Sequence, residues 1–202
     1  MYVYDLPAGR GHRFHAGPIG DQIIGGWYTS GIVTMMSGVP LTVSEGNPAY
    51  GGGLTLSPST AAIPTAPITG IGKNNVVGTT AGTSAGGAAG TGMNLFSIPD
   101  AVFSSIRWVN IGSDTRSGKA NPFYGLPFKN FDMSLGKTTK ITERVNTRFS
   151  ADFFNVFNHP NFSNPSLSLQ SPATFGVITS TFTPPNRTNS ARWIELGLRV
   201  EF

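Results

Sequence analysis

The chain ends in Arg192–Phe202, RWIELGLRVEF, where apolar and polar side chains alternate up to the final aromatic residue. The apolar side chains of this stretch are Ile194, Leu196, Leu198, Val200 and Phe202. The residues between them are Glu195, Gly197, Arg199 and Glu201. Alternation with a period of two is typical of a β-strand with one apolar face. The stretch therefore predicts a terminal strand over residues 192–202.

Four earlier segments also have the composition of strands, being rich in β-branched and aromatic residues or alternating in polarity. They are Tyr2–Leu6, Gln22–Val43, Phe128–Lys137 and Arg144–Phe157. In the second of them, the glycines and Pro40 indicate a bend or bulge rather than a helix. We expect an all-β fold, an antiparallel meander of about five strands that forms the C-terminal part of a transmembrane β-barrel with long external loops.

The connections between these segments differ greatly in length. Lys137 and Arg144 are joined by a short polar turn. Two connections are long, one over residues 45–127, rich in Gly, Ala, Thr and Pro, and one over residues 158–191. We expect the first to be a poorly ordered surface loop, because a structureless insert of this length is unusual in a compact domain. Short turns that alternate with long loops are typical of outer-membrane barrels, so both long connections are expected to be external.

The two faces of the predicted strands differ in chemistry. One face carries charges of both signs, which neighbouring strands could pair across a wet lumen: Asp132, Arg148, Asp152, Glu195 and Arg199. The other is apolar and predicted to face lipid: Phe131, Met133, Leu135, Phe149, Phe153, Ile194, Leu196, Leu198, Val200 and Phe202. A lipid-facing charge would cost about 2–4 kcal/mol at mid-bilayer, and these stretches have none. Trp27, Tyr28 and Trp193 lie near strand ends, where an aromatic girdle is expected. The alternative is a soluble β-sandwich that serves as a binding or adhesion module, since its strands show the same alternation.

The overall composition excludes several classes of protein. The net charge is +4, but the 14 Lys and Arg are scattered without a basic run or reading helix, so no nucleic-acid partner is expected. Without Cys, neither a disulfide scaffold nor a thiolate zinc site is possible. No stretch approaches the ~18 apolar residues of a membrane-spanning helix.

Catalytic and metal-binding motifs are weak. Gly82–Gly86, GTSAG, matches the nucleophile elbow with Ser84 as nucleophile, but no good helix start follows, and Asp152 and His159 lie in the wrong chain order. His12 and His15 form an H-x-x-H pair with Asp21 as the nearest third ligand, for which a solvated turn is the better interpretation. His159, before a proline, is interpreted as loop architecture. We therefore expect no enzyme activity, no catalytic residue, no metal site and no cofactor.

The terminal strand also resembles a known signal. Glu195–Phe202 is similar to the C-terminal motif of outer-membrane barrel proteins, with Glu195, Gly197, Val200 and Phe202 at the matching positions. In that class the barrel-assembly machinery reads the motif, which makes this machinery an expected partner. The exposed backbone of the last strand could be bound by strand addition.

Two longer stretches resemble one family. GGWYTSGIVTMMSGVPLTV and ITERVNTRFSADFFNVFNHPNFSNP are similar to the last strands of TonB-dependent receptors, nearest to the Oar-like subgroup with a carboxypeptidase-regulatory-like domain. Such receptors have a signal peptide, a TonB box, a plug and about 22 strands. The resemblance implies a fragment, over residues 1–202, of an outer-membrane transporter for a bulky substrate. We expect outer-membrane lipid as a partner, TonB and a plug only in a full-length protein, and no transport by this segment alone.

Overall fold

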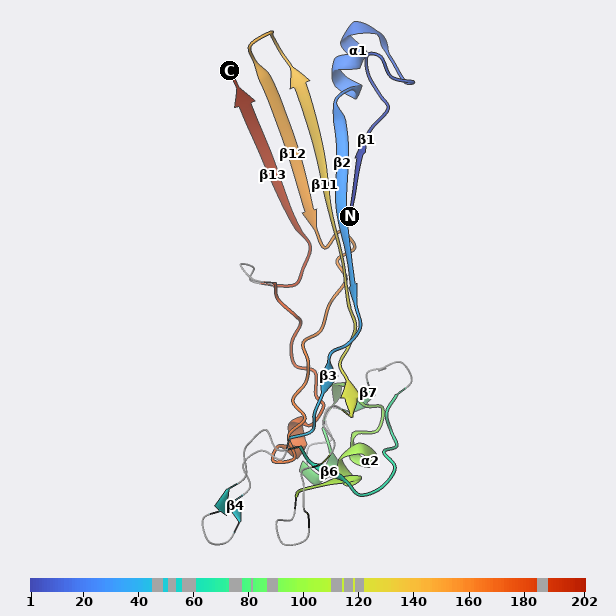
Figure 1. Ribbon diagram of the computed structural model, residues 1–202, viewed down its shortest axis with the longest axis vertical. Helices are drawn as coiled ribbons and strands as arrows, with labels where there is room; N and C mark the ends of the chain where they lie inside the picture. Colours follow the sequence, from blue (N-terminus) through green and yellow to red (C-terminus); the bar gives the residue numbers. More distant parts are fainter. Residues whose placement is uncertain are drawn as a thin grey trace. The chain divides into compact units, whose positions relative to one another are not determined.

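The five extended segments form one antiparallel sheet in the computed structural model (Figure 1). The strand order β1-β2-β11-β12-β13 follows the order of the sequence, as in a meander. The strands are β1 (Tyr2–Asp5), β2 (Trp27–Met36), β11 (Phe128–Lys140), β12 (Asn146–Phe154) and β13 (Trp193–Glu201). The prediction of an all-β, five-stranded antiparallel meander is confirmed.

The structure describes residues 1–44, 49–50, 54–55, 61–72, 78–80, 82–86, 91–109, 114, 118, 122–184 and 189–202. These residues divide into two compact units. The sheet unit comprises Met1–Met36, Lys129–Pro160 and Thr183–Phe202, and the loop unit comprises Ser37–Phe128 and Asn161–Phe182.

The segment predicted as one strand over 22–43 is instead divided among three elements. Its first residues belong to helix α1 (Gly17–Ile24), followed by β2 and then the short β3 (Pro40–Leu41). Pro18 lies in the first turn of α1, where a missing N–H costs nothing and a fixed φ suits the helix. The other predicted boundaries hold to within a few residues, the largest differences being three residues more at the end of β11 and three fewer at the end of β12.

The loop unit consists of short elements, which apart from β3 come from the two long connections. Besides β3 they are β4 (Ala49–Tyr50), β5 (Leu54–Thr55), β6 (Ile63–Pro64), β7 (Gly78–Thr80), η2 (Ser84–Gly86), β8 (Thr91–Asn94), α2 (Pro99–Ser104), β9 (Ile106–Arg107), β10 (Phe123–Tyr124) and η3 (Pro172–Thr174). Among the residues that the structure describes, four two-stranded ladders form, β10-β3, β4-β5, β6-β9 and β7-β8. The prediction that residues 45–127 lack order is therefore wrong for the described part of this connection.

A hydrophobic core explains why the loop unit is ordered. Val43 lies just before the first connection, which contributes Ala62, Leu95, Phe96, Val102, Ile106 and Phe123, and the second connection contributes Leu167, Leu169 and Phe175. The ring of Phe96 lies 4.9 Å from that of Phe123 and 5.7 Å from that of Phe175, so the two connections share one aromatic cluster. Buried Asn94 joins them again, because its Nδ2 donates to the carbonyl of Phe175 at 2.8 Å.

Candidate functional site

The register of β11, β12 and β13 divides their side chains between two faces. Residues directly opposite one another share a face. Met133 lies opposite Phe153 and Phe153 opposite Ile194, and the next apolar pairs repeat this arrangement along the strands. The apolar face thereby brings together Met133, Leu135, Phe149, Ala151, Phe153, Ile194, Leu196, Leu198 and Val200. The sheet thus carries nearly all the residues predicted to face lipid on one surface.

Phe131 and Phe202 mark two edges of this apolar face. Phe131, two residues before Met133, lies on the same face, and its ring stacks with that of Tyr2 at 6.5 Å. Phe202 follows β13 directly and is 99% exposed. Leu196 and Leu198 are 72% and 73% exposed, values that a two-layered soluble domain would not leave on its inner face.

Two lysines, which were not among the residues predicted to face lipid, lie on the apolar face near the ends of its β11 part. Alternation along β11 places Lys129 and Lys137 on the face of Phe131 and Met133, with the apolar residues of the strand between them. Lysines at the two ends of an apolar stretch can extend their ammonium groups towards water while their methylene chains cover apolar surface.

The opposite face carries the charges, and the register places like charges opposite each other. Arg148 lies directly opposite Arg199, and Asp152 lies directly opposite Glu195. Like charges that oppose each other across a ladder are destabilising, so each needs another partner. Arg199 forms its ion pair with Glu201 on its own strand at 3.1 Å. Asp152 accepts a hydrogen bond from the Ser134 hydroxyl of the neighbouring strand. The β12–β13 ladder itself therefore opposes charges of like sign, and pairing of opposite charges across a lumen stays a prediction.

The charges are also separated along the strands. Lys140, Arg148 and Arg199 lie towards the end of the sheet at which β11 turns into β12. Asp132, Asp152 and Glu195 lie towards the other end, where a hollow of about 180 Å³ is lined in part by Asp132, Ser134 and Asp152. Glu201 also lies at the first end, paired with Arg199, so the polar face has a net positive charge at one end and a net negative charge at the other.

The residues of the predicted aromatic girdle, Trp27, Tyr28 and Trp193, do not share one face of the sheet. The Trp27 ring packs edge to face on Phe149 of the apolar face, with 6.5 Å between centroids. Tyr28 lies on the polar face, because a Cβ on Gly136 would be 2.1 Å from the Tyr28 ring. Trp193 also lies there, since its Nε1 donates to Glu195 at 3.1 Å. All three residues lie near strand ends, as the sequence predicts, but Tyr28 and Trp193 lie on the face opposite to Trp27.

Asn155 ties together the ends of the last strands, a role that sequence reasoning missed. It follows β12, is only 6% exposed and has a φ of 53°. Its Nδ2 donates to the carbonyls of His159 at 3.0 Å and Ser190 at 2.9 Å, and its Oδ1 accepts from the His159 N–H at 2.9 Å. Its own N–H donates to Asp132 Oδ1 at 2.8 Å. These bonds join β11, β12 and the segment before β13. They give Asn155, in the FFNVFNHPNF stretch, a structural role.

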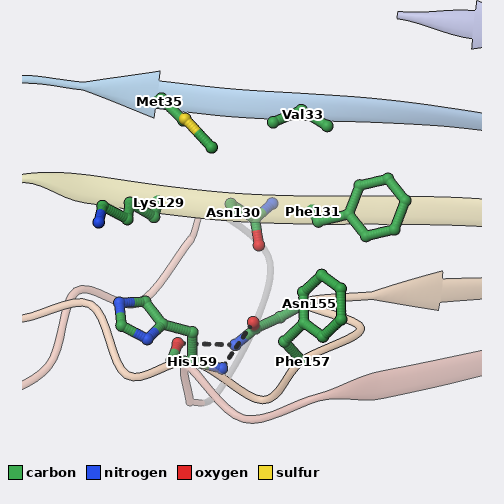
Figure 2. Close-up of a pocket in the computed structure, with 8 residues that line it drawn as sticks. All are labelled: Val33, Met35, Lys129, Asn130, Phe131, Asn155, Phe157 and His159. Carbon is green, nitrogen blue, oxygen red and sulfur yellow. Dashed lines mark hydrogen bonds between the residues drawn. The ribbon is translucent and has the colours of Figure 1, made fainter.

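An apolar hollow lies beside this junction. Figure 2 shows it between β2, β11 and the turn after β12, lined by Val33, Met35, Lys129, Asn130, Phe131, Asn155, Phe157 and His159. Its volume is about 500 Å³. The rings of Phe131 and Phe157 stack with their centroids 5.6 Å apart. His159, interpreted from sequence as loop architecture, is held through its backbone by Asn155.

The remaining sequence candidates lie in different parts of the chain. Ser84 starts the short η2 in the loop unit, and its N–H donates to Asp100, whereas Asp152 and His159 belong to the sheet unit. His12 and His15 are both exposed in the turn before α1. Among the described residues, no group of three His, Cys, Asp or Glu side chains is placed to hold a metal ion. No helix in the described ranges is long and apolar enough to cross a membrane.

The residues of the predicted assembly signal lie on β13 and just after it. Glu195 and Gly197 belong to the polar face, opposite Asp152 and Ser150, and Val200 belongs to the apolar face. Gly197 sits close to its neighbour, because a Cβ there would be 2.7 Å from the Ser150 hydroxyl oxygen. Reading of this motif by an assembly factor stays a prediction.

One comparison with known proteins gives a match. A family model described as an outer membrane beta barrel domain matches residues 1–194. No curated protein and no solved structure matches the chain.

Proposed function

Because the chain belongs to the family of outer membrane β-barrel domains, and hence to the bacterial outer membrane, we propose that it is barrel wall from the C-terminal end of a TonB-dependent receptor. The observation that carries this proposal is the sheet with one apolar and one charged face. In a barrel the apolar face contacts lipid and the charged face lines the lumen. A soluble sandwich is disfavoured by the exposure of Leu196 and Leu198.

Strand lengths support the membrane assignment. β2, β12 and β13 contain 10, 9 and 9 residues. A tilted transmembrane strand needs ~9–11 residues. β11 is longer, at 13 residues, and carries a lysine near each end of its apolar face, where the strand would leave the hydrocarbon.

The proposed orientation places the end of β13 at the periplasmic rim. The short turn between β11 and β12 then lies on the periplasmic side, and both long connections lie outside. The loop unit, built from these two connections, would then be the external part that meets a bulky substrate. Outer-membrane lipid, the assembly machinery and, in a complete receptor, TonB and a plug are the proposed partners. Neither a catalytic role nor a cofactor is proposed.

A chimeric receptor tests the TonB assignment. The last five strands of a TonB-dependent receptor would be replaced by residues 1–202, and uptake would be measured in cells with and without TonB. We expect a heat-modifiable, assembled barrel whose uptake requires TonB. The plug and the TonB box of the chimera come from the host receptor, so an assembled chimera that has lost TonB-dependent uptake would contradict the receptor role. Failure to assemble would contradict the assignment as C-terminal wall. The chain expressed alone should give no energy-dependent uptake.

A further inference from the structure

The connection between β1 and β2 is a folded element held at one end of the sheet. The Leu6 N–H donates to the Trp27 carbonyl at 2.9 Å, and the Gly9 N–H donates to the Phe14 carbonyl at 2.8 Å. α1 closes this connection, and Asp21 Oδ1 accepts from the N–H of Ala16 at 2.8 Å. Within the sheet unit, α1 lies at the same end as the turn between β11 and β12 and the C-terminus (Figure 1).

Two side chains of the apolar face hold the last turn of α1. Trp27 Nε1 donates to the Ile23 carbonyl at 3.0 Å. Lys137 Nζ donates to the carbonyls of Gln22, at 2.9 Å, and Ile23. The same ammonium lies 5.0 Å from the centre of the Trp27 ring, a cation–π contact. A positive charge at the C-terminal carbonyls also complements the helix dipole. The helix is therefore fixed to the edge of the lipid-facing surface.

The helix and the turn before it expose large apolar side chains. Ile19 and Ile23 are 78% and 66% exposed, and their spacing of four residues places them on one side of α1. Phe14, in the preceding turn, is 56% exposed. In the described part of the sheet unit, no other element covers the exposed surfaces of Phe14, Ile19 and Ile23.

Basic side chains surround these apolar groups. Arg10, His12, Arg13 and His15 are all exposed, and the guanidinium of Arg13 lies 5.9 Å from the centre of the Phe14 ring. Asp21 is the sole acidic residue between residues 6 and 26. Apolar side chains next to exposed arginines match the boundary between acyl chains and anionic headgroups.

We propose that the turn over residues 10–15 and α1 form an interfacial anchor that binds anionic phospholipid at the membrane surface. Ile19, Ile23 and Phe14 enter the acyl boundary, and Arg10 and Arg13 contact phosphate groups. Charge complementarity and attachment to the apolar face through Trp27 and Lys137 favour lipid over a protein partner. This proposal rests on the proposed function, because it requires that the apolar face be in a bilayer.

Single-cysteine labelling tests the anchor, since the chain has no cysteine of its own. Ile19→Cys, Ile23→Cys and Glu143→Cys variants of the full chain would carry an environment-sensitive dye in vesicles of phosphatidylcholine and phosphatidylglycerol. We expect blue-shifted emission, quenching by brominated lipid and protection from iodide at the two helix positions. Glu143, exposed in the turn at the same end of the sheet, is the matched control and should be quenched by iodide.

A Leu198→Cys label separates the two proposals. If Leu198 is in lipid but the helix labels are quenched by iodide, the anchor is overturned while the barrel assignment stands. If Leu198 is also in water, both are overturned.

Energy transfer from tryptophan to dansyl-labelled phosphatidylglycerol tests the charges. Each arginine near an anionic surface is worth about fivefold in affinity, so Arg10→Gln with Arg13→Gln should weaken lipid binding about 25-fold. Arg192→Gln, beside the start of β13 at the other end of the sheet, should leave affinity unchanged. Equal affinity for the double variant and the control would overturn the role of the arginines and, with it, the anionic-lipid anchor.

Discussion

Replacement of Asn155 by alanine should be among the most damaging single changes in the sheet unit. The side chain makes three hydrogen bonds, to the backbone of His159 and Ser190, and it is almost completely buried. At about 1 kcal/mol each, these bonds contribute about 3 kcal/mol. The φ of 53° costs an alanine about 1–2 kcal/mol more, which asparagine and glycine largely avoid. The expected loss of unfolding free energy is therefore about 4–5 kcal/mol.

Asn155→Gly separates these two contributions. Glycine tolerates the left-handed backbone but removes the same bonds, so we expect a loss about 1 kcal/mol smaller than that of the alanine variant. Asn158 is the graded control, because its φ is also positive, at 51°, but its Oδ1 accepts a single bond, from the Arg192 N–H at 2.9 Å. Asn158→Gly should cost about 1 kcal/mol.

Urea unfolding of the refolded chain in detergent micelles, followed by tryptophan fluorescence, gives the free energies by linear extrapolation. Trp193, which begins β13 close to this junction, is a local reporter. If the unfolding free energy of Asn155→Ala were within about 1 kcal/mol of that of the unmodified chain, the reasoning would be refuted. The three hydrogen bonds and the positive φ could not then both contribute the free energies given above.

Four further changes test other parts of the structure. Leu198→Arg on the apolar face should cost about 2–4 kcal/mol in bilayers and much less in water, measured by unfolding in lipid vesicles. Gly136→Val should cost about 1–3 kcal/mol by displacing the Tyr28 ring, and Tyr28→Ala in the same chain should recover most of the loss in the same assay. Phe175→Ala, at a residue with no exposed surface, should cost about 3–5 kcal/mol and increase proteolysis within the loop unit. Deletion of Phe202 should reduce the assembled, heat-modifiable fraction in cells while leaving refolding in micelles unchanged.

The sequence predicted the strands better than the connections, and the reason is physical. A period of two is a local signal, so the face of Phe153 or Leu198 can be read without knowing its neighbours. Register is not local, because it depends on how the strands align after each turn. The opposition of Arg148 to Arg199 was therefore not visible, although each was correctly placed with the charged residues.

The order of the loop unit was missed because its core is sparse and long-range. Val43 ends a predicted strand, whereas Phe96 and Phe123 are far apart in a segment dominated by Gly, Ala, Thr and Pro, and no periodicity connects the three. Part of their packing comes from Phe175, beyond two strands of the sheet. A composition-based reading of one segment cannot detect such a partner.

The candidate site shows the same division. Alternation identified which residues share the apolar face, but not the role of Asn155, which depends on contacts with Asp132 and Ser190. The sequence did not predict α1, because the segment is rich in Gly and contains Pro. Pro18 and the spacing of Ile19 and Ile23 are signals that could have identified this helix.

The shared core of the two long connections limits how this protein can be engineered or diversified. If only one connection were exchanged between relatives, Phe175 or Phe96 would lose its aromatic neighbour. A cavity would then open in the core of the loop unit. A graft must therefore transfer both segments as one cassette. Across homologues, substitutions at positions such as Val43 and Leu167 should covary despite their separation along the chain.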